Sequence, residues 1–259
     1  MILPEMDYVK VVEHITKKLR WYVTDYAHKE TGVLGLSGGI DSTVTTYLAT
    51  MALGKDKVLV FLLPSRVTPK EDMEDAMDVI ERLEIPATNW KIVSIDSIVE
   101  AFEKTLERVG NLERGNIMAR VRMTILHHEA ALHNGLVIGT GDRSELLMGY
   151  FTKYGDAGVD VLPIAGLYKT YVKQLAKHLK VPERIIQKPP SPRLWPGQTA
   201  EEELGIDYET LDAILYLKFD KGFDEEEITR HYAIPRELVK KVLSRVETTR
   251  HKRQFPEVL

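Results

Sequence analysis

Short apolar segments alternate with amphipathic segments through the first half of the chain, and this alternation restricts the possible folds more than any other feature. The apolar runs predict four buried strands, over about residues 32–36, 57–64, 89–95 and 136–139. The segments around them predict helices over about residues 6–28, 42–53, 68–83, 97–108 and 116–133. Strands that read as nearly continuous apolar runs are typical of a parallel sheet covered on both faces. We therefore expect an α/β fold, a doubly wound, mainly parallel sheet with helices on both faces.

Proline and hydroxyl residues mark further boundaries. Thr68 is followed by Pro69 and an acid, so we expect the Thr68 hydroxyl to cap the third helix and Pro69 to lie in its first turn. The segment from Lys188 to Gly197 contains four prolines and predicts a long loop. Three helices are predicted to follow, from about Tyr208, Asp224 and Pro235. We expect a single domain over residues 1–259 with a helical C-terminal extension.

Composition excludes several classes of protein. Among 259 residues, 35 Lys and Arg nearly balance 39 Asp and Glu, so nothing indicates a protein that coats nucleic acid. The absence of cysteine excludes disulfide scaffolds, thiolate metal sites and thiol nucleophiles. No apolar run is long enough to cross a membrane, and the acidic N-terminal segment lacks the positive charge of a signal peptide. We expect a cytoplasmic chain that binds neither nucleic acid nor membrane.

A turn of small residues joins the first predicted strand to the next helix. The sequence G-L-S-G-G-I-D-S, from Gly35 to Ser42, lets backbone N–H groups point together at an anion beside the helix N-terminus. Ser37 and Ser42 add hydroxyl donors. Asp41 would repel a phosphate unless a divalent cation lay between them, so its presence indicates Mg²⁺. The turn differs from a Walker loop, because G-x-x-x-x-G-K-[ST] occurs nowhere in the chain.

Two other interpretations of this turn remain open. Residues 35–39 also fit G-x-S-x-G, the nucleophile elbow of serine hydrolases, which would make Ser37 a nucleophile. The turn could also be a plain glycine-rich connection that binds nothing. A separate lookalike, from His128 to His133, has one residue too many for the zinc motif H-E-x-x-H, so its two imidazoles would lie about 140° apart around a helix. The spacing favours phosphate binding at the turn and no zinc site on the helix.

The turn and the residues after it resemble a known family. The run from Ser37 to Ser42, after an apolar strand, resembles the PP-loop of the ATP pyrophosphatase superfamily, whose members cleave ATP between its α and β phosphates. Five more segments follow in order, at residues 139–145, 150–156, 167–170, 188–191 and 194–199. With them, the chain resembles the ammonia-dependent NAD synthetase family over nearly its whole length.

The resemblance implies roles for particular residues. ATP would be bound by Gly35, Leu36, Ser37, Gly38, Gly39, Ile40, Asp41, Ser42, Thr140, Lys169 and Ser191. Mg²⁺ would be held by Asp41 and Glu145. Deamido-NAD would be contacted by Arg120, Lys153, Asp160, His251 and Lys252. In this scheme Lys169 would stabilise the charge that develops as pyrophosphate leaves.

The resemblance also implies a reaction, the last step of NAD biosynthesis. The carboxylate of deamido-NAD attacks the α-phosphorus of ATP to give an acyl-adenylate and pyrophosphate, and ammonia then displaces AMP to give NAD. These steps need positioning and charge neutralisation but no covalent nucleophile. Because the chain has no cysteine and is too short for an added glutaminase domain, we expect it to use ammonia directly. Because the family works as a homodimer, we expect one here, with the N-terminal helix and the helix over 116–133 as candidate interface elements.

Two segments depart from the family pattern. Ala157 stands where the family has glycine, a change that leaves Asp160 in place. Pro192 and Arg193 replace an Ala-Asp pair, which alters the charge and stiffness of the proline-rich loop. That loop, around residues 188–199, and the segment 151–160 are the parts we expect to close over the site and keep water from the acyl-adenylate.

Three competing hypotheses make different predictions. The chain could belong to the same superfamily but amidate or thiolate a nucleotide base or a tRNA, although thiolation normally uses a cysteine persulfide. A serine hydrolase would use Ser37 with a histidine such as His251 and would need no ATP. A nucleotide-sensing module would bind ATP without releasing pyrophosphate.

Overall fold

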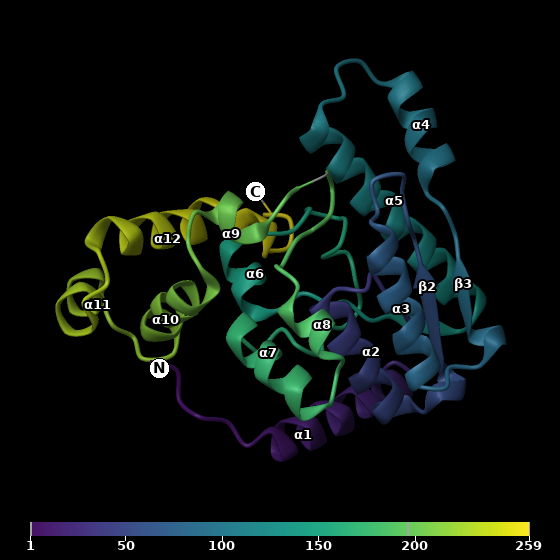
Figure 1. Ribbon diagram of the computed structural model, residues 1–259, viewed down its shortest axis with the longest axis horizontal. Helices are drawn as coiled ribbons and strands as arrows, with labels where there is room; N and C mark the ends of the chain where they lie inside the picture. Colours follow the sequence, from purple (N-terminus) through teal and green to yellow (C-terminus); the bar gives the residue numbers. More distant parts are fainter. Residues whose placement is uncertain (1, 196, 259) are drawn as a thin grey trace.

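The computed structural model describes residues 2–195 and 197–258 and contains a four-stranded parallel sheet (Figure 1). Its strands, in the spatial order β3-β2-β1-β4, are β1 Thr31–Gly35, β2 Val58–Leu62, β3 Trp90–Ile92 and β4 Gly135–Val137. The chain builds outward from β1 to β3 and then returns to add β4 on the other side of β1. The strand order therefore reverses between β1 and β4, and ligands of open parallel sheets bind at such a point, beyond the carboxyl ends of the strands.

Side chains alternate across the sheet and separate two helical layers. The helices of the first half are α1 Tyr8–Trp21, α2 Ile40–Leu53, α3 Lys70–Arg82, α4 Asp96–Thr105 and α5 Asn111–Leu132. Leu34 and Val60 face a cluster built with α1, α2 and α3. Val33 and Phe61, their neighbours in sequence, face a second cluster built with α4 and α5. The expected α/β fold, with helices on both faces of a parallel sheet, is confirmed.

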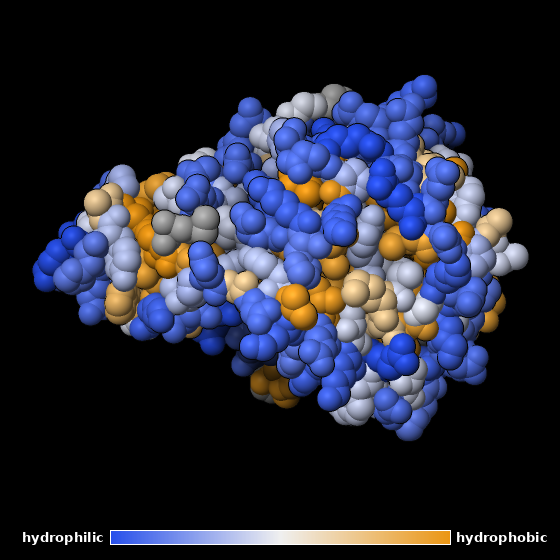
Figure 2. All heavy atoms as spheres, turned by 60° about the horizontal axis from the view of Figure 1, so that its bottom comes forward, coloured by the Kyte–Doolittle hydropathy of each residue, from blue (hydrophilic) through white to orange (hydrophobic). Residues whose placement is uncertain are grey.

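The second half of the chain is helical and extends the first of these clusters. Its helices are α6 Arg143–Met148, α7 Lys169–His178, α8 Glu183–Gln187, α9 Ala200–Leu204, α10 Tyr208–Phe219, α11 Glu225–Tyr232 and α12 Arg236–Thr248. Helix α7 packs on α2, and α10 packs on both α6 and α7. Helices α10, α11 and α12 form a lobe at one end of the molecule (Figure 1). The face in Figure 2 is mainly hydrophilic, with hydrophobic side chains gathered over this lobe and in smaller groups elsewhere.

Several boundaries differ from those expected. Helix α5 begins at Asn111, five residues earlier than residue 116, and α8 and α9 were not expected. The expected Thr68 cap is wrong, because Pro69 is the N-cap of α3. The Thr68 hydroxyl instead accepts a hydrogen bond from the backbone N–H of Ser65 at 2.9 Å, within a turn that closes before the helix begins.

Within residues 2–195 and 197–258, no helix combines the length and the apolar character that a membrane span requires.

Candidate active site

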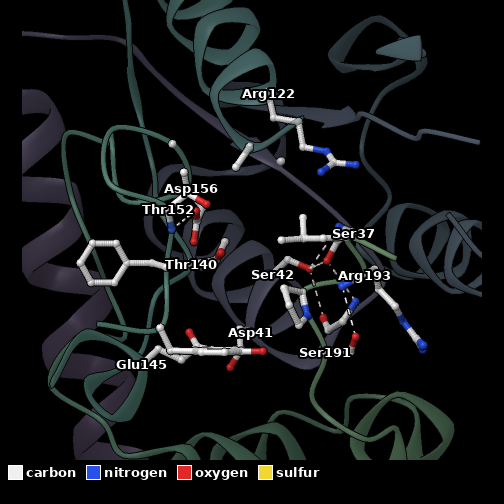
Figure 3. Close-up of a pocket in the computed structure, with 18 of the residues that line it drawn as sticks. Ser37, Asp41, Ser42, Arg122, Thr140, Glu145, Thr152, Asp156, Ser191 and Arg193 are labelled. Atoms are coloured by element: carbon white, nitrogen blue, oxygen red, sulfur yellow. Dashed lines mark hydrogen bonds between the residues drawn. The ribbon is translucent and has the colours of Figure 1, made fainter. Parts of the chain in front are cut away.

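A cavity of about 770 Å³ lies beyond the carboxyl ends of the strands (Figure 3). Its walls come from the turn after β1, from the residues after β2 and β4, from α5 and from the proline-rich segment. Ser37, Asp41, Thr140, Glu145 and Ser191 all line it, although they are far apart in the sequence. The predicted ATP and Mg²⁺ residues therefore meet at the point where the strand order reverses, between β1 and β4.

Hydrogen bonds within the turn after β1 fix its shape. The Ser42 hydroxyl accepts from the backbone N–H of Ser37 at 3.2 Å and donates to the carbonyl of Gly39 at 3.1 Å. The Ser37 hydroxyl accepts from the backbone N–H of Gly39 at 3.3 Å. Gly38 has φ +78°, and a Cβ on it would lie 2.1 Å from the backbone carbonyl oxygen of Asp72 on α3. Only glycine fits there. The first residues of α2, whose N–H groups have no partner within the helix, line the cavity.

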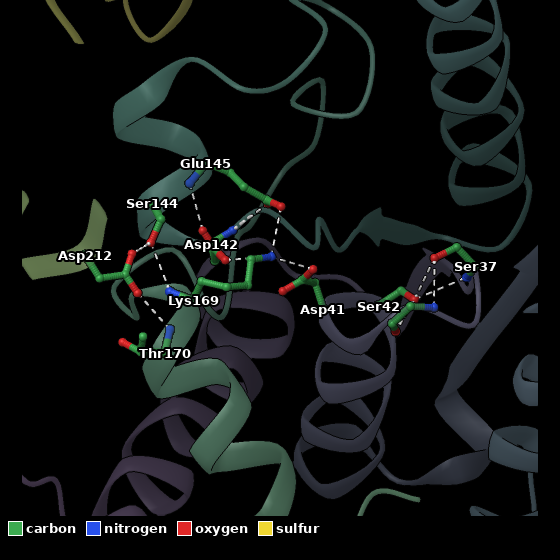
Figure 4. A network of polar contacts seen from close by, with 10 residues as sticks. Ser37, Asp41, Ser42, Asp142, Ser144, Glu145, Lys169, Thr170 and Asp212 are labelled. Carbon is green, nitrogen blue, oxygen red and sulfur yellow. Dashed lines mark hydrogen bonds and ion pairs between the residues drawn. The ribbon is translucent and has the colours of Figure 1, made fainter. Parts of the chain in front are cut away.

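Four charged side chains meet beside the turn (Figure 4). The ammonium of Lys169, whose side chain has no exposed surface, lies 2.7 Å from Asp41, 2.8 Å from Asp142 and 2.9 Å from Glu145. Burial alone would lower the pKa of Lys169, but the three carboxylates outweigh it and raise that pKa well above its ordinary value. Burial also raises the pKa of Glu145 well above its usual range. The cluster holds more acidic than basic groups, which favours a second cation.

The carboxylates of Asp41 and Glu145 fit a divalent cation. Oδ1 of Asp41 is buried and has no hydrogen-bond partner within the described part of the chain. Both side chains line the cavity and are partly exposed to it. No group of three or more His, Cys, Asp or Glu side chains in residues 2–195 and 197–258 is arranged to hold a metal alone. A cation here would need phosphate and water oxygens as further ligands, which is how Mg²⁺ is commonly held with a nucleotide.

The predicted site residues fall into three groups. Those that line the cavity are Gly35, Leu36, Ser37, Gly39, Ile40, Asp41, Ser42, Thr140, Glu145, Ser191 and Lys252. Gly38 shapes the turn, and Lys169 lies behind Asp41 and Glu145. Four residues expected to contact deamido-NAD do not line the cavity, and these are Arg120, Lys153, Asp160 and His251. The geometry therefore brings the ATP and metal residues together but leaves most of the predicted dinucleotide residues outside this space.

Local contacts explain the positions of three residues that were predicted to contact deamido-NAD. Arg120 is exposed on α5 and donates to the backbone carbonyl of Lys153 at 3.2 Å. The Asp160 carboxylate accepts from the backbone N–H of Val137, at the end of β4, at 2.7 Å. The Lys252 ammonium, by contrast, donates to the carbonyls of Gly149 and Phe151 in the cavity wall.

Comparison with known proteins agrees with this geometry. The family model described as NAD synthase matches residues 11–256. The chain belongs to the NAD synthase family. The NH(3)-dependent NAD(+) synthetase of Saccharolobus solfataricus is 49% identical to it over 253 residues, covering 98% of this chain and 90% of that one. That of Hyperthermus butylicus is 49% identical over 256 residues, covering 98% and 91%.

Solved structures of related proteins have the same fold. An NH3-dependent NAD synthetase from Campylobacter jejuni has a TM-score of 0.83 and 32% identity, with 98% of this chain and 100% of that one covered. The NMN synthetase from Francisella tularensis has a TM-score of 0.86 and 33% identity, with 98% and 99% covered. The resemblance inferred from the sequence is thus confirmed at the level of the NAD synthase family.

A serine hydrolase is not supported by the site. The Ser37 hydroxyl lies 3.0 Å from that of Ser42 and serves the turn. No histidine among the described residues lines the cavity, and His251 lies exposed outside it. Ser37 therefore lacks the base that a nucleophilic serine needs.

Two residues of this NAD synthase site were not predicted from the sequence. Asp142 caps α6 by accepting from the backbone N–H of Glu145 at 2.8 Å, and the D-x-x-E spacing of a capping box could have indicated it. Arg122 of α5 also lines the cavity and donates through Nε to the carbonyl of Leu63 at 3.0 Å. Burial lowers the pKa of Arg122 to about 10, which still leaves it charged at neutral pH. No sequence pattern distinguished it from the other arginines of that helix.

The proline-rich segment is tied to α3 by ion pairs. Lys188 pairs with Asp72 at 2.6 Å and with Asp75, and both of these carboxylates are buried. Arg193, one of the two departures from the family pattern, pairs with Asp72 at 3.0 Å. The hydroxyl of Ser191 donates to the carbonyl of Gln198 at 2.6 Å, so it already has a partner within the loop. These contacts hold the segment against α3, and its closure over a ligand stays a prediction.

Replacement of Gly38 by alanine should lower the free energy of unfolding by more than the strain of a positive φ alone would. Gly222 offers a matched control, because it has φ +77° and nothing within 4 Å of its added Cβ. Gly222→Ala should lower the free energy of unfolding by about 1 kcal/mol. Gly38→Ala should lower it further and weaken ATP binding by about tenfold or more, because the turn must move away from α3. Denaturant unfolding and calorimetric titration measure both effects. Wild-type ATP affinity in Gly38→Ala would contradict a phosphate-binding role for the turn.

Asp212, a buried carboxylate on α10, should make stability depend on pH. Burial raises its pKa to about 7 from an ordinary 3.8. Between about pH 4 and 7 the folded chain keeps a proton that the unfolded chain has released, so the free energy of unfolding falls as pH rises, by up to about 1.4 kcal/mol per unit. Asp212→Asn lacks this proton equilibrium, so it should lose less stability than the wild type between pH 5 and pH 8 in denaturant unfolding. Parallel pH curves for the two proteins would show that the pKa of Asp212 is unshifted.

Proposed function

We propose that the chain catalyses the ATP-dependent amidation of deamido-NAD with ammonia, giving NAD, AMP and pyrophosphate through an acyl-adenylate. The observation that carries the proposal is the meeting of the turn after β1 with Asp41 and Glu145 in one cavity. Such a site can bind a triphosphate through backbone N–H groups and hold a divalent cation against it. Membership of the NAD synthase family supports a ligase that forms a C–N bond.

The chemistry requires activation of a carboxylate. A carboxylate oxygen of deamido-NAD attacks the α-phosphorus, and the bond from that phosphorus to the bridging oxygen breaks to release pyrophosphate. Ammonia then attacks the activated carbonyl carbon, loses a proton and displaces AMP. Because AMP is a far better leaving group than oxide, adenylation makes the second step possible. The chain supplies positioning and charge neutralisation, which suffice for phosphoryl chemistry of this kind.

Different residues of the cavity bind the phosphates and the metal ion in this proposal. The turn from Gly35 to Ser42 holds the phosphates, and Thr140 lies at the opposite lip where β4 ends. Asp41 and Glu145 would hold Mg²⁺, which when bound supplies positive charge to the leaving pyrophosphate. Lys169 reaches a phosphate only if its ammonium leaves the carboxylates that it now contacts. We propose that nucleotide and Mg²⁺ binding cause this exchange of partners.

The dinucleotide extends out of the cavity in this proposal. Lys252 marks the part of its binding site inside the cavity, whereas Arg120, Lys153 and Asp160 lie outside the cavity. The expected homodimer, with α1 and α5 as candidate interface elements, stays a prediction. A cytoplasmic location and a single domain over residues 1–259 stay predictions.

A second acceptor is favoured by one of the related structures. The similarity to an NMN synthetase, at a TM-score of 0.86, makes nicotinate mononucleotide an alternative acceptor for the same reaction. The higher identity to curated NAD synthetases, 49% against 33%, favours the dinucleotide.

The decisive assay measures pyrophosphate released from ATP by the purified chain, with Mg²⁺, deamido-NAD and ammonium, and omits one component at a time. We expect NAD and equal amounts of AMP and pyrophosphate only with all components, and at most about one pyrophosphate per chain without ammonium, because the acyl-adenylate stays bound. Nicotinate mononucleotide and glutamine replace deamido-NAD and ammonium in parallel arms and should support much slower turnover.

Each other outcome excludes part of the proposal. Faster turnover with the mononucleotide would reassign the acceptor. Equal use of glutamine and ammonium would contradict direct use of ammonia. ATP binding without pyrophosphate release under any condition would leave a nucleotide-sensing module.

A further inference from the structure

Asp212 is a buried acid to which the proposed reaction gives no task. It lies on α10, has no exposed surface and does not line the cavity. Its carboxylate accepts from the hydroxyl of Ser144 at 2.5 Å and from the backbone N–H of Thr170 at 2.8 Å (Figure 4). Ser144 is itself fully buried and belongs to α6, and Thr170 belongs to α7. One carboxylate therefore joins the N-terminal turns of two helices.

These bonds take the place of a helix cap. The N-cap residue of α7, Tyr168, makes no side-chain capping bond. The backbone N–H of Lys169 instead donates to the Ser144 hydroxyl at 2.9 Å, and that of Thr170 donates to Asp212. Donors at the start of a helix have no partner within the helix, so a buried start needs acceptors from elsewhere. Asp212 and Ser144 provide these acceptors.

The helix starts joined in this way carry the reactive cluster. Lys169 is the first residue of α7, and Glu145 follows Ser144 directly in α6. The separation between the Lys169 ammonium and Glu145, 2.9 Å, therefore depends on how the two starts are held together. A shift of about 1 Å in a group that must meet a substrate can lower a rate by about a hundredfold.

We propose that Asp212 is a positioning residue that holds Lys169 of α7 in register with Glu145 of α6, and thereby sets the rate of adenylation. The inference rests on the proposed function, because it assigns Lys169 to the phosphates. Asp212 touches no substrate. Its effect passes through the backbone of Lys169 and through Ser144.

A second carboxylate on α10 provides the control. Asp220, at the end of that helix, accepts from Arg143 of α6 at 3.0 Å and from the hydroxyl of Tyr168, next to α7, at 2.5 Å. It connects the same helices but bonds only to side chains, and it is partly exposed. Asp220→Ala should therefore cost stability while leaving the start of α7 in place.

The test compares Asp212→Ala, Asp212→Asn and Asp220→Ala at a temperature where all three are folded. Asp212→Ala should lower the rate of pyrophosphate release at saturating substrates by about 10- to 100-fold and leave the KM for deamido-NAD within about twofold. Asp212→Asn should restore the rate to within about threefold of wild type, because its amide oxygen can still accept from Thr170. Asp220→Ala should keep the wild-type rate even if its Tm falls by roughly 5 °C.

A readout that does not need catalysis accompanies the rates. Hydrogen exchange at the amides of residues 169–172 should quicken at least about tenfold in Asp212→Ala and stay unchanged in Asp220→Ala. A normal rate of pyrophosphate release in Asp212→Ala, or an equal loss in Asp220→Ala, would overturn the inference while the active wild type keeps the proposed function. An inactive wild type would overturn the proposed function and with it the effect on rate. Unchanged exchange in Asp212→Ala would then separately show that Asp212 does not hold the start of α7.

Discussion

One buried ammonium among three carboxylates organises the centre of this protein. Lys169 comes from the start of α7, Asp41 from the start of α2, and Asp142 and Glu145 from the start of α6. Removing a partner from such a buried cluster leaves an uncompensated charge, which costs several kcal/mol. The cluster therefore ties three helix starts to one point, beside the place where the strand order reverses. A cation that replaces the ammonium can enter without unbalancing these charges.

Local signals made much of this architecture predictable. Apolar runs of four to eight residues predicted all four strands, and the turn from Gly35 to Ser42 predicted an anion site because small residues there expose backbone N–H groups. Glu145, which the resemblance assigned to Mg²⁺ together with Asp41, occupies the third position of α6 and lines the same cavity as Asp41. The boundaries were less predictable. Gly115, which favours a later start of α5, lies inside that helix and packs closely against Leu194 of a distant loop.

Other features depend on partners that are far away in the sequence. Lys169 was expected to contact phosphate, yet it pairs with Asp41, 128 residues before it. Nothing in the sequence distinguishes Asp212 from other acids on helices. It is buried because α10 packs on α6 and α7. Arg193 departs from the family pattern, and only the packing of the proline-rich segment on α3 supplies its partner, Asp72. Such residues follow from tertiary packing, which spacing along the chain does not encode.

The exchange of Lys169 for a divalent cation is the central claim, and one crystal structure tests it most directly. Crystals grown with ATP and Mn²⁺ in place of Mg²⁺ would locate the metal by its anomalous scattering. The account requires a manganese peak within bonding distance of Asp41 and Glu145, with the Lys169 ammonium moved from Asp41 onto a phosphate oxygen. Bound nucleotide with no metal between those carboxylates, and Lys169 still held by all three acids, would contradict it.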